Sequence, residues 1–153
     1  VKDAICSIKY NDNTYLAETL AQLMIDYSLK YIQLEKIDAI AQIPLHWRKK
    51  RERGFNQSLL LAVKIGSSLN IPVIKKSVLR TKYTPSQIEL SGKMRLSNVK
   101  GVFKAIKPNN FRGRRILLID DVFTTGATLN ECSKVIMEAG AKDIWAFTAT
   151  KAT

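Results

Sequence analysis

The sequence is poor in the residues that build metal sites and disulfides. Its only cysteines, Cys6 and Cys132, lie far apart and belong to no CxxC pair. A zinc site made from this chain's cysteines alone is therefore excluded. We expect reduced, buried thiols in a cytoplasmic protein. The only histidine, His46, follows Pro44 closely and is interpreted first as a turn residue.

Long apolar runs are also missing. No run approaches the ~20 residues that a membrane helix requires, so we expect no membrane insertion. The start, Val1-Lys2-Asp3, lacks the apolar core of a secretory signal. The hydrophobic content of 46% is ordinary for a folded protein. A length of 153 residues predicts a single domain, 1–153.

Acidic residues are fewer than basic residues. There are 13 Asp and Glu residues against 25 Lys and Arg, which gives a net charge of +12. Such a charge attracts polyanions, but it does not separate nucleic acid from a polyphosphorylated small molecule. Basic residues gather at 48–53, 93–100 and 112–115, with few aromatic residues among them. This weakens the case for a nucleic-acid groove, which normally pairs cations with exposed aromatic side chains.

Periodicity predicts strands that alternate with helices. Helices are predicted at 14–31, 55–69 and 127–139, and strands at 38–43, 116–119 and 144–148, with weaker strands at 71–79 and 99–106. The second helix is expected to bury Phe55, Leu59, Ala62, Val63 and Leu69. Residues 80–98 show no period, and a loop of this length inside a domain is usually functional or disordered. The pattern predicts an α/β fold with an open, mainly parallel sheet flanked by helices.

One segment, 116–128, combines a strand, two acids, a loop and a helix start. The apolar run ends at Asp120 and Asp121, and a loop of small and hydroxylated residues follows. Ligands of open α/β sheets bind beyond the carboxyl ends of the strands, and a helix N-terminus attracts phosphate. The expected phosphate-binding residues are Thr124, Thr125, Gly126, Ala127 and Thr128.

The paired acids indicate more than a phosphate. Asp120 and Asp121 would repel a phosphate but would accept hydrogen bonds from two neighbouring sugar hydroxyls. They are also the candidate metal ligands, for a hydrated Mg²⁺. Neither a Walker Gly-Lys-Thr/Ser loop nor a GxGxxG fingerprint is present. The segment therefore predicts a site for a ribose 5-phosphate.

The segment resembles the motif for phosphoribosyl pyrophosphate (PRPP) of type I phosphoribosyltransferases. Together with Ile43-Pro44-Leu45-His46, Arg53-Gly54-Phe55-Asn56-Gln57 and Gly101-Val102-Phe103, it is similar to the ComF family of phosphoribosyltransferase-like competence proteins. Gln87, Arg95 and Asn98 add to this resemblance, which covers about residues 10–150. The four-cysteine zinc module that many ComF-like proteins carry at the N-terminus is absent from this sequence.

The resemblance implies roles for further residues. Leu45 and His46 would lie in the pyrophosphate loop, and residues 80–98 would be a mobile loop that closes over PRPP, with Arg95 and Lys93 as candidate catalytic residues. The block that contains Arg53, Asn56 and Gln57 would shape the site. The implied cofactor is Mg²⁺, bound with PRPP.

Two functions follow from the resemblance. One is a glycosyltransferase of the phosphoribosyltransferase type, acting in DNA uptake on an unidentified acceptor. The other is a non-catalytic module for PRPP, for single-stranded DNA or for a protein of the competence machinery. The sequence does not decide between these two functions, and it does not decide whether the chain forms a homo-oligomer.

Overall fold

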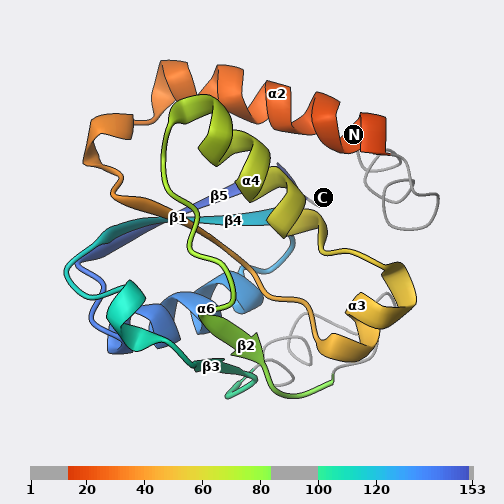
Figure 1. The fold of residues 1–153 in the computed structure, drawn as a ribbon, viewed down its shortest axis with the longest axis vertical. Coiled ribbons are helices and arrows are strands. Elements are labelled where there is room, and N and C mark those ends of the chain that lie inside the picture. The colour runs from red at the N-terminus through yellow and green to blue at the C-terminus, as the bar shows by residue number, and fades with distance from the viewer. Residues whose placement is uncertain (1–13, 84–99, 152–153) are drawn as a thin grey trace.

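The computed structural model describes residues 14–83 and 100–151, which form three layers (Figure 1). A parallel sheet lies in the middle, helices α2 and α4 cover one face, and helix α6 covers the other. The helices are α2 (Thr14–Tyr31), α3 (Trp47–Arg53), α4 (Gln57–Leu69) and α6 (Ala127–Glu138), with short 3-10 turns η1 (Leu34–Lys36) and η2 (Pro108–Asn110). This arrangement agrees with the predicted open α/β sheet.

The central sheet has the strand order β1-β4-β5, and all pairs are parallel. Its strands are β1 (Ala39–Gln42), β4 (Arg115–Phe123) and β5 (Asp143–Lys151). An isolated parallel bridge between Ile40 and Val73 lies on the other side of β1. A separate antiparallel pair is formed by β2 (Val78–Arg80) and β3 (Phe103–Ala105). The carboxyl ends of β1 and β4 therefore lie side by side, where the candidate site is expected.

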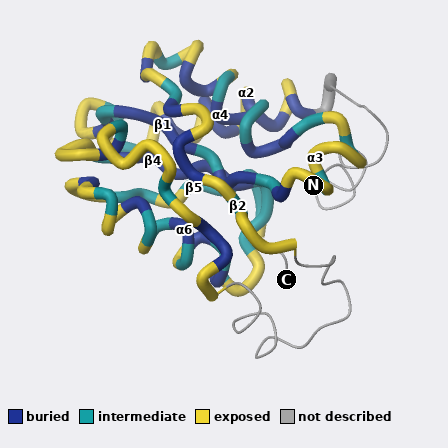
Figure 2. Tube along the Cα trace, turned by 60° about the horizontal axis from the view of Figure 1, so that its bottom comes forward, coloured by how far each residue is buried: buried dark blue, intermediate teal, exposed yellow. Residues whose placement is uncertain are grey.

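Alternation along β4 produces the two halves of the core. Ile116 and Leu118 pack toward α6, whereas Leu117 and Ile119 pack toward α2 and α4. All four side chains are fully buried, as expected for a central parallel strand covered on both faces. Figure 2 shows this buried centre in dark blue between more exposed helices.

Most predicted elements are confirmed, and their ends differ. Helix 14–31 matches α2, and α6 ends at Glu138, close to Gly140, which has a φ of +93°. Strand β4 continues four residues beyond Ile119, because its pairing with β5 runs on to Phe123. The weak strand at 71–79 is only an isolated bridge at Val73 followed by β2.

The predicted buried face of α4 is right only in part: Ala62 is buried, and Phe55 and Leu69 are partly buried against the core. Leu59 and Val63 are only half-buried, whereas the buried residues are Gln57, Ser58, Leu61, Ala62, Ile65 and Gly66. The reason is that α4 packs against both the sheet and α2, so its covered side is broader and rotated from the predicted stripe.

Helix α3 was not predicted. It contains Trp47 and six charged residues, and none of its residues is buried. It therefore carries no apolar periodicity to detect. Within residues 14–83 and 100–151, no helix is both long and apolar enough to cross a membrane.

Candidate functional site

Asp120 and Asp121 lie near the carboxyl end of β4, the central strand. The prediction placed them after the strand, but they belong to it, since Asp120 is in register with Thr148 of β5. Asp120 is only 8% exposed, whereas Asp121 is half-buried. The two acids therefore differ: one is fixed inside the fold, and the other is nearer the surface.

The Asp120 carboxylate is held by two donors. The Ser58 hydroxyl donates to Oδ1 at 2.9 Å, and the backbone N–H of Asp121 donates to the same oxygen at 2.9 Å. Burial, and next the charge of Asp121, raise the pKa of Asp120 to about 8. Asp120 is thus a buried acid that holds a proton near neutral pH in the absence of a ligand that stabilises its anion.

A short loop, residues 124–126, connects β4 to α6. Thr124 and Thr125 are exposed, and Gly126 adopts a left-handed conformation with φ +76° and stands at the N-cap of α6. A Cβ on Gly126 would lie 3.1 and 3.3 Å from atoms of the Phe123 ring. Because glycine has no side chain, it caps no N–H group of α6, and only a long 3.4 Å contact joins the Ala127 N–H to the Thr125 hydroxyl. This 12-residue helix therefore offers its first N–H groups to an anion. Thr128, the second residue of α6, is half-buried.

His46 lies just beyond β1, next to Leu45. It is 5% exposed and stands at the N-cap of α3, where the Arg48 N–H donates to Nδ1 at 3.3 Å. Burial lowers the pKa of His46, and the charges of Arg48, Arg80 and Lys49 lower it further. His46 is therefore neutral at pH 7, with Nδ1 as acceptor. Leu45 is half-buried beside it.

The block from Arg53 to Gln57 connects α3 to α4 beside the strand ends. Gly54 turns the chain with φ +77°, and the Asn56 amide donates to the carbonyl of Ile43 at 3.1 Å. Gln57 is 5% exposed, and its Nε2 has no hydrogen-bond partner within the described part of the chain. Arg53 is half-buried at the end of α3. Asn56 thus fixes the start of α4 to Ile43, the residue after β1, and Ser58 fixes it to Asp120 of β4.

Sequence reasoning missed two residues of this site, Ser58 and Arg80. Arg80 was placed in the unstructured loop 80–98, but it belongs to β2 and lies over the Phe103 ring at 5.6 Å. Burial lowers the pKa of Arg80, and the charge of Asp120 counteracts this effect. Because Arg80 also lowers the pKa of His46, this cation acts on both strand ends. No local pattern marks either residue, since Ser58 and Asp120 are 62 positions apart.

The two remaining candidates, Lys93 and Arg95, lie outside the described residues, as does most of the predicted loop 80–98. Their roles stay predictions. The structure thus brings together the acids, the loop 124–128, the start of α4 and Arg80 near the carboxyl ends of β1 and β4.

The acids do not form a complete metal site by themselves. No group of three or more His, Cys, Asp or Glu side chains comes together among residues 14–83 and 100–151. Mg²⁺ often takes one or two carboxylates and completes its shell with water and substrate phosphates. Asp120 and Asp121 fit this mode of binding, in which the ion arrives with a phosphorylated ligand.

Curated relatives reveal the family. The chain is 37% identical over 140 residues to Competence protein F of Haemophilus influenzae, covering 89% of this chain and 61% of that protein. It is 30% identical over 151 residues to DNA utilization protein YhgH of Escherichia coli, covering 95% of this chain and 66% of that protein. The chain belongs to the ComF family. No protein-family model matches it. This ComF-family chain spans somewhat less than two thirds of the length of these relatives.

A solved structure supports the fold of this ComF-family chain. Adenine phosphoribosyltransferase from Thermoanaerobacter pseudethanolicus superposes with a TM-score of 0.59 at 14% identity, covering 92% of this chain and 70% of that enzyme. At this identity the similarity concerns the fold alone. The predicted type I phosphoribosyltransferase fold is therefore confirmed.

Proposed function

We propose that this ComF-family chain binds PRPP at the carboxyl end of β4. The observation that carries the proposal is the buried Asp120, followed within a few residues by a helix start that has Gly126 at its N-cap position and no side-chain cap. An acid pair beside an anion site favours a phosphorylated sugar over either phosphate or sugar alone.

Each part of the ligand has a suitable partner. Asp120 and Asp121 would accept hydrogen bonds from the two ribose hydroxyls, and residues 124–128 would bind the 5-phosphate. The pyrophosphate would lie toward Leu45 and His46, where Arg80 supplies a nearby positive charge. Asn56 and Gln57 would keep the start of α4 in place, and Lys93 and Arg95 would approach from the loop.

The proposed reaction is transfer of phosphoribose to an acceptor. The lone pair of the acceptor would form a bond to the anomeric carbon as the bond to pyrophosphate breaks, and pyrophosphate would leave with that electron pair. Mg²⁺ would supply charge neutralisation on the pyrophosphate. The chain's own part is positioning and electrostatic stabilisation, because the reaction requires no protein nucleophile. The names of the two relatives suggest a setting in competence or DNA utilization.

Ligand specificity tests this binding mode. We expect PRPP with Mg²⁺ and ribose 5-phosphate to raise the melting temperature, whereas equal concentrations of ribose or inorganic phosphate should raise it little. If phosphate alone stabilised the protein as well as ribose 5-phosphate does, the acids would play no part in binding. A screen of amines and bases for pyrophosphate release, with Asp120→Asn/Asp121→Asn as control, tests transfer separately.

A second function, binding of single-stranded DNA, is favoured by one surface. The exposed Trp47 and Tyr83 lie on either side of cations: Arg48 is 5.4 Å from the Trp47 ring and 5.6 Å from the Tyr83 ring, and Lys49 is 5.9 Å from Tyr83. His46 contacts both rings, with centroid distances of 5.6 and 5.4 Å. The fold thus brings Tyr83, which is distant in the sequence, beside Trp47 and the basic residues that follow it. Cations next to exposed aromatic rings are typical of strand-binding grooves.

Fluorescence anisotropy with a labelled oligothymidine tests this function. Binding should weaken as salt rises, survive Asp120→Asn/Asp121→Asn, and weaken in Trp47→Ala. Lys104→Ala, which removes an exposed cation on β3, serves as control. An absence of binding at low salt would refute the proposal, and so would equal losses in the two alanine variants.

A further inference from the structure

Helix α2 carries an exposed apolar stripe that the ligand site does not use. Leu23, Tyr27 and Tyr31, each four residues after the last, are 58%, 53% and 69% exposed. Residues at this spacing lie on one flank of a helix. Their exposure excludes a role in the core for the two tyrosines. A contiguous apolar stripe of this kind is typical of an interaction surface.

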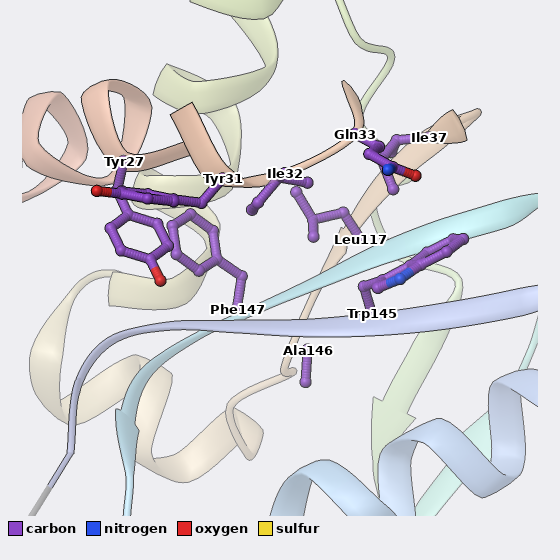
Figure 3. Close-up of a pocket in the computed structure, with 9 residues that line it drawn as sticks. All are labelled: Tyr27, Tyr31, Ile32, Gln33, Ile37, Leu117, Trp145, Ala146 and Phe147. Atoms are coloured by element: carbon purple, nitrogen blue, oxygen red, sulfur yellow. The ribbon is translucent and has the colours of Figure 1, made fainter. Parts of the chain in front are cut away.

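The stripe lies beside the free edge of the sheet. Within the described residues, β5 pairs with β4 alone, so its outer edge has no strand partner. Tyr27 stacks on Phe147 of β5 at 5.9 Å and contacts Tyr31 at 4.6 Å. Figure 3 shows Phe147 pointing from β5 toward Tyr27 and Tyr31 of α2, whereas Trp145 lies nearer Gln33 and Ile37. These residues help to line a pocket of about 440 Å³. No predicted ligand-site residue lines this pocket.

We propose that this surface, the stripe of α2 together with the outer edge of β5, binds a second copy of the chain. The two β5 strands would pair antiparallel about a twofold axis at Phe147, the middle of the nine residues Asp143–Lys151. In that register Asp143 of each copy lies opposite Lys151 of the other. The sheet would continue through both copies, and the two α2 stripes would meet on one face.

Charge complementarity favours a second copy over another occupant. The outer strand begins with an exposed acid and ends with an exposed base, so a twofold axis creates two opposite-charge pairs without any other partner. The seven residues between them are uncharged, so antiparallel pairing juxtaposes no like charges. Twofold contacts are self-complementary in this way, and pairing removes an open edge that would otherwise recruit other chains.

The oligomeric state of the full chain tests the stripe. Sedimentation velocity over a wide range of concentrations should show a dimer, and Leu23→Lys or Tyr31→Lys should weaken it by about tenfold or more. Leu29→Lys is the matched control, because Leu29 is 62% exposed on the same helix but on another flank. A monomer at every concentration would overturn the proposal, as would a dimer that Leu29→Lys weakens equally.

Charge reversal tests the register. Asp143→Lys alone and Lys151→Asp alone should each weaken the dimer roughly three- to tenfold, because each places like charges opposite one another. The double variant Asp143→Lys/Lys151→Asp should restore the association. If either residue had a purely structural role, the double variant would dimerise more weakly than the single variants. That result would exclude this register.

Discussion

At the scale of single residues, Asp120 lowers the stability of the fold and is also proposed to bind the ligand. It is buried, it accepts hydrogen bonds from Ser58 and from the Asp121 N–H, and its pKa is raised to about 8. Between pH 4 and 8 the folded protein keeps a proton on Asp120 that the unfolded chain has released, given an ordinary pKa of 3.8. This acid therefore destabilises the fold increasingly as pH rises through that window.

Asp120→Asn should remove this pH-dependent cost. The variant cannot ionise, and its Oδ1 can still accept both hydrogen bonds. We expect it to be more stable than the wild type by about 1–3 kcal/mol at pH 8, with the difference shrinking toward pH 4. Urea unfolding at several pH values measures it. Parallel pH profiles for the two proteins would show that the pKa of Asp120 is not raised.

Gly126 is constrained both by its backbone and by its neighbour. Its φ of +76° disfavours other residues, and a Cβ would crowd the Phe123 ring. Gly126→Ala should lose about 1–2 kcal/mol of stability and should also weaken PRPP binding. Gly113→Ala is the matched control, since Gly113 has φ +70° and a Cβ there would meet no atom within 4 Å. Thermal unfolding measures the loss of stability caused by backbone strain, and calorimetry measures the loss of PRPP affinity. Equal PRPP affinity in the two variants would contradict the assigned phosphate loop.

Residue roles in the site were only partly predictable. The motif at 116–128 indicated Asp120, Asp121 and the phosphate loop because strand, acids and helix start follow one another in the chain. Ser58 and Arg80 could not be found in this way, because they reach Asp120 through tertiary packing of α4 and β2. For His46, the structure shows a buried cap of α3, which extends the initial interpretation as a turn residue.

At the scale of elements, helices that bury an apolar stripe could be predicted from the sequence, whereas the exposed helix α3 could not. Helix α2 matched its predicted range because leucines recur at helical spacing. Helix α3 has no buried residue, and only its cap at His46 and the left-handed Gly54 mark its ends. The length of β4 was underestimated because its polar residues are held by pairing with β5, which the hydrophobic pattern does not record.

The amino ends of β1 and β4 are joined by one ion pair. Asp38 accepts hydrogen bonds from Nε and Nη2 of Arg115 at 2.9 Å each and from the Arg115 N–H at 2.8 Å. The Arg115 guanidinium and N–H hold the pKa of Asp38 well below its usual range. The pair therefore stabilises the fold above about pH 4, and this contribution is lost as pH falls through the lower, folded pKa.

Asp38→Asn should lower the melting temperature by a few degrees at pH 7, and the difference from the wild type should shrink in strong acid. This trend is opposite in sign to that of Asp120→Asn. Glu35→Gln, which removes a nearby exposed carboxylate, should change little. A loss that stayed constant from pH 7 to strong acid would indicate packing and not charge pairing.

At the scale of the whole molecule, the fold carries three proposed surfaces, of which the first two adjoin each other at His46. The proposed PRPP site lies at the carboxyl ends of β1 and β4, the cationic aromatic surface lies on α3 and Tyr83, and the proposed dimer surface lies on α2 and β5. The sequence predicted the first from a contiguous motif. The other two combine residues distant in the chain, so composition alone could only suggest them.

The central claim is that the acids and the loop after them bind PRPP. Isothermal titration calorimetry with PRPP and Mg²⁺ tests it most directly, comparing the wild type with Asp120→Asn/Asp121→Asn. We expect saturable binding to the wild type and a loss of about tenfold or more in affinity in the variant, since two carboxylate hydrogen bonds to the ribose would be weakened. Equal affinities, or no binding to the wild type, would contradict the account.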